Sequence, residues 1–151
     1  MRYFVDTAYD MDGDKLLSLA LVPADRKLHN LYLVSNDLEV EDDWVKENLL
    51  SVIKAPLPER THRFHVEKQF FGNALSHYLY GDIEPTIVAN SIESIGHFCD
   101  AVKRGLGMAG RFTAMNFSAV TLKLYPTVLK DAVQNNSLWD ALALREAMGA
   151  W

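Results

Sequence analysis

Three short apolar segments at the start of the chain constrain its fold most strongly. Residues 2–9, 16–22 and 28–34 each have the length and aliphatic content of a β-strand, and turn-forming residues separate them at 12–14 and 23–27. Connections this short leave no room for the long crossover that parallel strands need. The start of the sequence therefore predicts three antiparallel strands that form a meander.

The rest of the sequence alternates between helical and strand patterns. Apolar spacing and end signals predict helices at residues 43–54, 66–80, 92–104 and 137–148. Strands are expected at residues 85–89 and within 112–125. Asp42 or Asp43 is expected to cap the first helix, and Ser137 the last. This order predicts a single α/β domain over residues 1–151, in which the meander and further parallel strands form one mixed sheet flanked by helices.

Composition and charge limit the classes of function. Hydrophobic residues make up 49% of the chain and charged residues 23%, which is ordinary for a globular protein. No apolar run approaches the roughly 20 residues that span a bilayer, and no signal peptide is visible, so we expect a cytoplasmic protein without membrane contact. The net charge of −5 argues against a strongly electrostatic nucleic-acid binder.

Two histidines lie three residues apart between the first two predicted helices. His62 and His65 could bind a metal ion, but no cysteine or carboxylate stands at the spacing of a metal site, so we interpret this segment as a polar loop. Aromatic side chains of the helix predicted at 66–80, such as Phe70 and Tyr78, could stack on bases. Their helical spacing is more typical of core residues.

The two ends of the chain each carry an aspartate in a distinctive setting. Asp6 closes the apolar run YFVD (3–6), and Asp140 lies in the first turn of the last predicted helix, within NNSLWDA (135–141). This pair resembles the outer motifs of the DEDD 3′–5′ exonucleases, and the chain is most similar to a family of small bacterial 3′–5′ exoribonucleases. The resemblance implies a ribonuclease H-like fold. Trp139 is next to Asp140 and could lie at the mouth of the site or in a subunit contact.

The resemblance also implies a two-metal site for phosphodiester hydrolysis. In this family four carboxylates hold Mg²⁺ or Mn²⁺, and a histidine acts as the general base. Asp6 and Asp140 match two of the carboxylates, so we expect at most weak binding of Mg²⁺ or Mn²⁺ by this pair. Ala8 stands at the position of the second carboxylate, and Asn135 stands at that of the histidine.

The remaining carboxylate position falls on either Asn90 or Ser94, and neither residue is acidic. Three nearby groups could replace the lost ones. Asp10 lies on the same strand face as Asp6 and Ala8, but we interpret it as a turn residue. Glu93 is interpreted as a solvated acid in the first turn of a helix, where it is favourable to the helix dipole. His97 is expected near the mouth of the site and is a candidate base.

These residues leave three functional hypotheses. The leading one is an exoribonuclease-like protein that has lost most of its catalytic residues and binds single-stranded RNA or DNA, or a protein partner. The second is an active Mg²⁺- or Mn²⁺-dependent 3′–5′ exonuclease with a rearranged site. The third is a protein-interaction module without a nucleic-acid role, which the acidic net charge favours. Related exoribonucleases often form dimers, so the resemblance also implies a homodimer.

Overall fold

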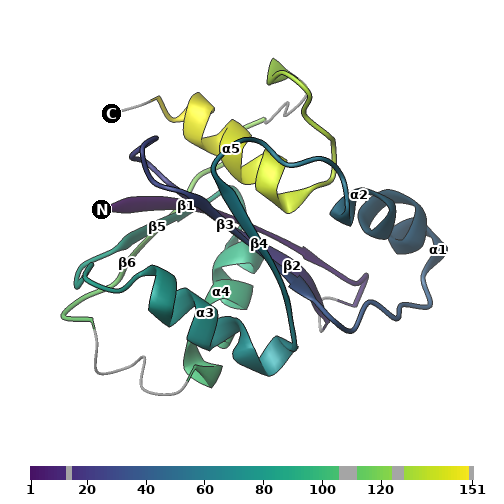
Figure 1. Cartoon of the computed structure of the whole chain (residues 1–151), viewed down its shortest axis with the longest axis horizontal. Helices are drawn as coiled ribbons and strands as arrows, with labels where there is room; N and C mark the ends of the chain where they lie inside the picture. The colour runs from purple at the N-terminus through teal and green to yellow at the C-terminus, as the bar shows by residue number, and fades with distance from the viewer. Residues whose placement is uncertain (13–14, 106–111, 124–127, 150–151) are drawn as a thin grey trace.

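A six-stranded mixed sheet forms the centre of the molecule (Figure 1). The structure, a computed structural model, describes residues 1–12, 15–105, 112–123 and 128–149. The strands, in the order β4-β3-β2-β1-β5-β6, are β1 (Arg2–Tyr9), β2 (Leu16–Pro23), β3 (Asn30–Ser35), β4 (Thr61–Val66), β5 (Thr86–Ala89) and β6 (Asn116–Ala119). β1, β2 and β3 pair antiparallel, which confirms the meander, whereas β4, β5 and β6 pair parallel to β3, β1 and β5. The α/β class with a mixed sheet is therefore confirmed.

Helices cover both faces of the sheet. They are α1 (Asp43–Val45), the π-helical turn η1 (Lys46–Leu50), α2 (Ser51–Ile53), the 3-10 turn η2 (Lys68–Phe70), α3 (Phe71–Tyr78), α4 (Ile92–Arg104) and α5 (Ser137–Ala147). α5 and the continuous stretch from α1 to α2 pack on one face, and α3 and α4 pack on the other (Figure 1). Within the part of the chain that the structure describes, no helix combines the length and apolar character needed to cross a bilayer.

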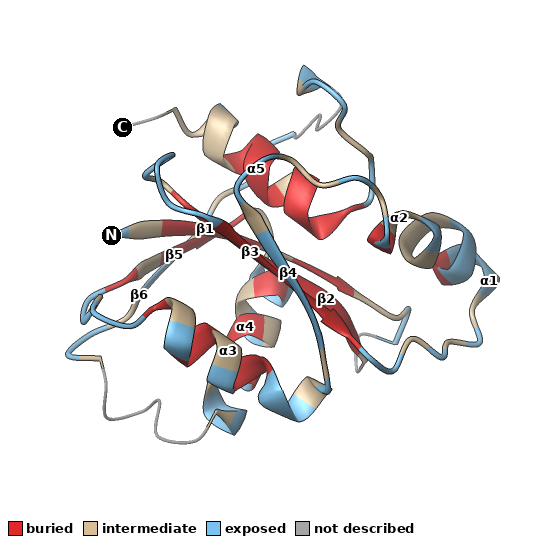
Figure 2. Ribbon diagram, viewed as in Figure 1, coloured by how far each residue is buried: buried red, intermediate tan, exposed pale blue. Residues whose placement is uncertain are grey.

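The central strands are buried on both faces because helices cover each side. Phe4 and Ala8 of β1 face the α5 side, whereas Tyr3 and Val5 face α3 and α4. Every residue of β2 and β3 is buried, as a sheet covered on both sides requires (Figure 2). Asp6 thus lies between Phe4 and Ala8 on the strand face that packs against α5.

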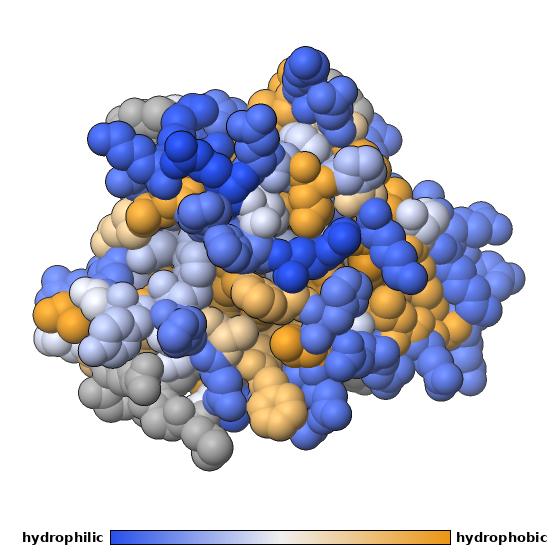
Figure 3. Space-filling view, viewed as in Figure 1, coloured by the Kyte–Doolittle hydropathy of each residue, from blue (hydrophilic) through white to orange (hydrophobic). Residues whose placement is uncertain are grey.

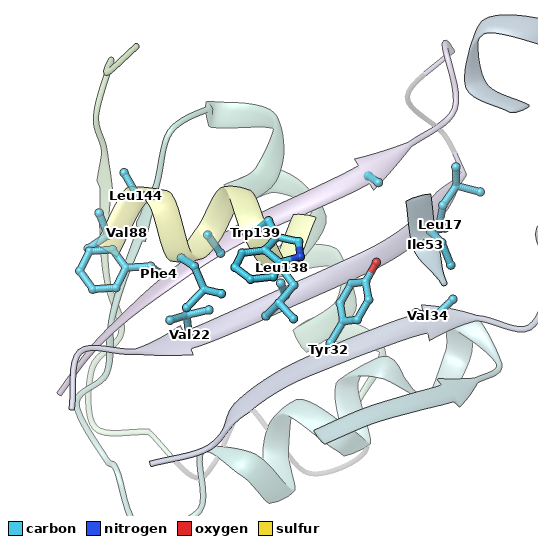
Figure 4. Packing of buried hydrophobic residues seen from close by; sticks show 14 of the residues in the cluster. Phe4, Leu17, Val22, Tyr32, Val34, Ile53, Val88, Leu138, Trp139 and Leu144 are labelled. Atoms are coloured by element: carbon cyan, nitrogen blue, oxygen red, sulfur yellow. The ribbon is translucent and has the colours of Figure 1, made fainter. Parts of the chain in front are cut away.

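The first turn of α5 is part of this core. Leu138 and Trp139 lie over the strands next to Phe4, Val22 and Tyr32 (Figure 4). Trp139 is only 5% exposed, so it lies neither at the mouth of a site nor in a subunit contact. The expectation for this residue was wrong because the helix turns it towards the sheet.

The segment after α2 differs most from the prediction. Residues 61–66 form β4 where a polar loop was expected, and the helix predicted from residue 66 begins only at Phe71, after η2. The interior of β4 is exposed, so the segment lacks the apolar pattern by which a strand is usually recognised. Pairing with β3 supplies its backbone hydrogen bonds, and this tertiary contact overrides the weak local signal.

The helix caps are confirmed at one end and corrected at the other. Asp42, one of two candidates, caps α1. Asn136, not Ser137, caps α5, because its side-chain oxygen accepts the backbone N–H of Leu138 at 3.0 Å. The Ser137 hydroxyl instead lies 2.9 Å from the hydroxyl of Ser18 on β2, in a buried hydrogen bond. The predicted strand within 112–125 is present as the short strand β6.

Candidate functional site

The two ends of the chain meet at a pocket of about 350 Å³ at the carboxyl end of β1. Its walls come from β1 and the following turn, from α1 and η1, and from the start of α5. Its polar lining includes Asp6, Asp10, Asn135, Ser137 and Asp140, and its apolar lining includes Ala8, Met11, Trp44 and Leu49. The structure therefore brings together Asp6, Ala8, Asn135 and Asp140, four of the six positions that the resemblance assigns to the site.

The other two assigned positions differ in their relation to the pocket. The Ser94 hydroxyl, at the start of α4, donates a hydrogen bond to Asp6 Oδ1 at 3.4 Å and lies 3.0 Å from the hydroxyl of Thr7. Asn90, at the end of β5, accepts the backbone N–H of Leu122 at 2.9 Å and so faces the segment after β6. Of the two candidates for the middle position, only Ser94 contacts Asp6.

A buried polar network fixes the start of α5 and with it the position of Asp140. The side-chain amide of Asn136 donates to the carbonyl of Val52 at 2.9 Å and to the Tyr32 hydroxyl at 3.4 Å. Burial raises the pKa of Tyr32, against hydrogen bonds from neighbouring side chains that lower it, so its hydroxyl stays protonated. Asp140 lies one turn further along, and its backbone N–H donates to the carbonyl of Asn136 at 2.9 Å. The helix therefore presents Asp140 from a rigid base.

The pKa values of both aspartates are raised in this pocket. Burial raises the pKa of Asp6 well above its usual 3.8, and the negative charge of Asp140 raises it further, while hydrogen bonds from Ser94 and Thr7 act in the opposite direction. Burial raises the pKa of Asp140 to about 7. Two carboxyl groups in one partly buried pocket resist joint ionisation, so the pair holds a proton near neutral pH and titrates as a unit.

The donor set does not fit a two-metal centre. Mg²⁺ and Mn²⁺ require several oxygen ligands, and each ion of such a centre needs its own share of carboxylates. Outside residues 13–14, 106–111, 124–127 and 150–151, no group of three or more histidine, cysteine, aspartate or glutamate side chains is arranged to hold a metal ion. Of the six positions that the resemblance assigns to the site, only Asp6 and Asp140 carry a carboxylate.

The three groups that could replace missing ligands or the base are Asp10, Glu93 and His97, and each has contacts of its own. Asp10 lines the pocket, but its carboxylate accepts the backbone N–H of Lys15 at 3.1 Å, which agrees with the interpretation as a turn residue. Glu93 is exposed in the first turn of α4 and does not line the pocket. The His97 ring packs against Tyr9 with 4.5 Å between ring centroids, and burial lowers the pKa of this histidine. Tyr9 thus lies between His97 and the pocket, which it lines.

Trp44 is a candidate ligand-contacting residue that the sequence did not predict. It lines the pocket from α1, and its side chain is 51% exposed. A large aromatic side chain that is half in solvent beside two partly buried carboxylates is typical of a ligand-contacting residue. Trp44 directly precedes Val45 in the sequence. Val45 packs into the apolar core and Trp44 does not, and this difference within the helix was the only signal for Trp44.

No protein-family model and no curated protein matches this sequence. Any assignment of function therefore depends on the motifs at the two chain ends and on the geometry of the pocket in which they meet.

Proposed function

We propose that the chain is a 3′–5′ exoribonuclease-like protein of the ribonuclease H-like fold that has lost catalysis and binds the end of a single-stranded nucleic acid. One observation carries the proposal: Asp6, Ala8, Asn135 and Asp140 come from opposite ends of the chain and line one pocket. The antiparallel meander, followed by β5 and β6 in parallel and by helices on both faces, agrees with the fold that the resemblance implies.

Loss of catalysis is supported by the chemistry of the replaced groups. An asparagine amide cannot accept and release a proton near neutral pH, so Asn135 cannot serve as a general base. Ala8 provides no metal ligand, and Ser94 provides a neutral hydroxyl where a carboxylate is expected. The active-nuclease alternative needs other residues for these roles, and Asp10 is engaged with Lys15 in the turn after β1.

Binding is supported by the apolar wall of the pocket. The exposed indole of Trp44 offers a stacking platform, and Met11 and Leu49 also line the pocket. Stacking of a base on an aromatic side chain contributes about 1–3 kcal/mol and is largely independent of sequence. The carboxylates of Asp6 and Asp140 oppose this binding by repelling phosphate groups, so affinity should increase as the pair becomes protonated.

Fluorescence anisotropy with a short labelled single-stranded RNA, and with DNA of the same sequence, tests this proposal in metal-free buffer. We expect tighter binding at pH of about 6 than at about 8, because the pKa of Asp140 is about 7. Trp44→Ala should weaken binding about tenfold. Tyr80→Ala is the matched control, because Tyr80 is 81% exposed and lies outside this pocket.

Absence of binding by the folded protein at either pH would contradict the nucleic-acid part of the proposal. Equal losses in Trp44→Ala and Tyr80→Ala would contradict the assignment of the pocket as the binding site. In the first case the protein-interaction hypothesis would take precedence, and in the second the nucleic acid would bind at another surface.

A further inference from the structure

We propose that the open edge of β4 binds an extended peptide segment of another protein, in which apolar and acidic residues alternate. The peptide would extend the sheet by one strand. This surface lies at the far side of β3 and β2 from β1 and shares no residue with the Asp6–Asp140 pocket, so the inference does not rest on the proposed function.

The first step is the unpaired edge of β4. β4 is the terminal strand of the sheet, and no other strand in the described ranges pairs with it besides β3. At its two ends, the N–H of Asn30 donates to the carbonyl of Arg60 and the N–H of Asn36 donates to that of Val66. Backbone groups of alternate residues in a parallel pair point to opposite sides. The groups that point outward therefore belong to Thr61, Arg63 and His65.

The second step is an apolar groove beside this edge. A cavity of about 590 Å³ lies between β4 and α3, and its lining includes Phe64, Val66, Phe70, Ala74 and Tyr78. The side chains of Phe64 and Phe70 are 48% and 47% exposed. Figure 3 shows hydrophobic side chains at the centre of the molecular face on which β4 and α3 lie. An added strand would direct every second side chain towards this groove.

The third step is the charge on the opposite face of β4. Arg63 and His65 alternate with the groove-lining residues and so lie on that face. Residues 60–66 contain two arginines, two histidines and no acid, in a chain whose net charge is −5. Of the residues of β4, Arg63 and His65 are the basic side chains of this face, since His62 lines the groove. The other side chains of an added strand would lie beside Arg63 and His65, and acidic residues complement them.

Charge also distinguishes the peptide from other occupants. In an antiparallel pair of two β4 strands that continues the sheet, Arg63 would lie near Arg63 of the second copy, where like charges repel. A nucleic acid lacks the alternating N–H and C=O groups that the outward-facing backbone of β4 can bind. The edge and groove therefore favour an acidic, apolar peptide strand.

Nuclear magnetic resonance with the full ¹⁵N-labelled chain tests the proposal. The probe is a capped peptide of about seven residues in which leucine or valine alternates with glutamate. Its control has the same composition, with all glutamates in one half. We expect saturable shifts of the β4 amides, Arg63 and His65 among them, with the alternating peptide only.

Two pairs of variants separate the contributions of charge and of the groove. Arg63→Glu should weaken peptide binding about tenfold, whereas Lys103→Glu, with the same change of charge on α4, should not. Phe64→Ala should weaken it by a similar factor, whereas Phe117→Ala, at a 44% exposed side chain on β6, should not. His65→Pro removes an outward N–H while leaving the pairing with β3 intact, and should abolish binding.

Several results would overturn the proposal. The first is the absence of any shift of the β4 amides at millimolar peptide. The second is an equal response to both peptides. The third is an unchanged peptide affinity in the Arg63→Glu and His65→Pro variants, provided that their amide spectra show an intact fold. A wild-type dimer in sedimentation that His65→Pro dissociates would assign the edge to a second copy. Shifts of the β4 amides by single-stranded RNA, absent with the peptide, would assign it to nucleic acid.

Discussion

Asp6 and Asp140 line one pocket and are partly buried there, although they come from opposite ends of the chain. Burial raises the pKa of both carboxyl groups, and the charge of Asp140 raises that of Asp6 further. A carboxyl group whose pKa is raised by folding opposes folding wherever it must ionise. Paired groups of this kind are more typical of a functional site than of a stabilising interaction. This supports the view that the pair is a remnant of catalytic chemistry.

The pH dependence of stability tests this view at Asp140. Its pKa in the folded chain, about 7, exceeds its ordinary value of 3.8, so the folded state binds the proton more tightly. The associated stability is present below about pH 4 and is lost as the pH rises through about 7, by on the order of 2–4 kcal/mol. Urea unfolding in metal-free buffer should therefore show that Asp140→Asn is more stable than wild type at about pH 8 but not at about pH 4. Glu93→Gln, at an exposed acid, is the control, and the same difference in that variant would contradict the assignment.

Among the polar residues on the α5 side of the sheet, Asn136 is the one whose substitution we expect to lower stability most. Its side-chain oxygen accepts from the backbone of Leu138 and Trp139, and its amide donates to Val52 and Tyr32. Asn136→Ala removes the cap and leaves buried polar groups unpaired, so we expect a loss of about 2–3 kcal/mol in the free energy of unfolding.

The neighbouring position provides the control for this substitution. Asn135 is exposed and has a positive φ of 60°, a conformation that glycine adopts readily. Asn135→Gly should therefore change stability by less than about 1 kcal/mol. Equal losses in the two variants, measured by urea unfolding, would show that Asn136 does not act through its buried hydrogen bonds.

At the scale of elements, α3 and α4 are in backbone contact at two glycines. A Cβ atom at Gly72 would lie 2.3 Å from the carbonyl oxygen of Ala101 and 2.4 Å from the backbone nitrogen of Gly105. Gly72→Ala must push the helices apart, and we expect it to lower the free energy of unfolding by about 3 kcal/mol or more. Gly96→Ala is the matched control: it lies within α4 with no atom near its Cβ, and it should raise stability by about 1 kcal/mol. Thermal unfolding measures the stability of both variants. A change of the same sign in Gly72→Ala and Gly96→Ala would contradict this explanation.

Elements with a strong local pattern could be predicted from the sequence, and those formed by tertiary contacts could not. The meander and α4 follow from apolar spacing and turn residues. β4 was missed because its exposed interior shows no apolar pattern and its hydrogen bonds come from β3. The cap of α5 was assigned one residue late because Asn136 and Ser137 are both good capping residues, and their partners on other elements decide between them.

The same distinction applies to the candidate site. Asp6 and Asp140 could be selected from the motifs at the chain ends, but their motifs left Asn90 and Ser94 as equal candidates. The choice between these two depends on how the start of α4 meets β1, where Ser94 reaches Asp6. Trp44 could not be assigned to the pocket because its contribution depends on how α1 lies relative to β1.

At the scale of the whole molecule, the candidate surfaces lie on different parts of the sheet. The pocket with the two aspartates lies at the carboxyl end of central β1, and the basic, apolar edge belongs to terminal β4. The two proposed binding sites share no lining residue, so the arrangement is compatible with a nucleic-acid end and a partner peptide bound at the same time.

The most direct test of the central claim is an assay for 3′–5′ degradation. A short single-stranded RNA labelled at its 5′ end is incubated with the folded protein in Mg²⁺ and then in Mn²⁺, beside an Asp6→Ala variant, and the same is done with DNA. We predict that neither protein shortens either strand, because the two carboxylates cannot form a two-metal centre. Stepwise shortening from the 3′ end by the wild type, abolished in Asp6→Ala, would contradict the account and show that other residues have replaced the lost ligands.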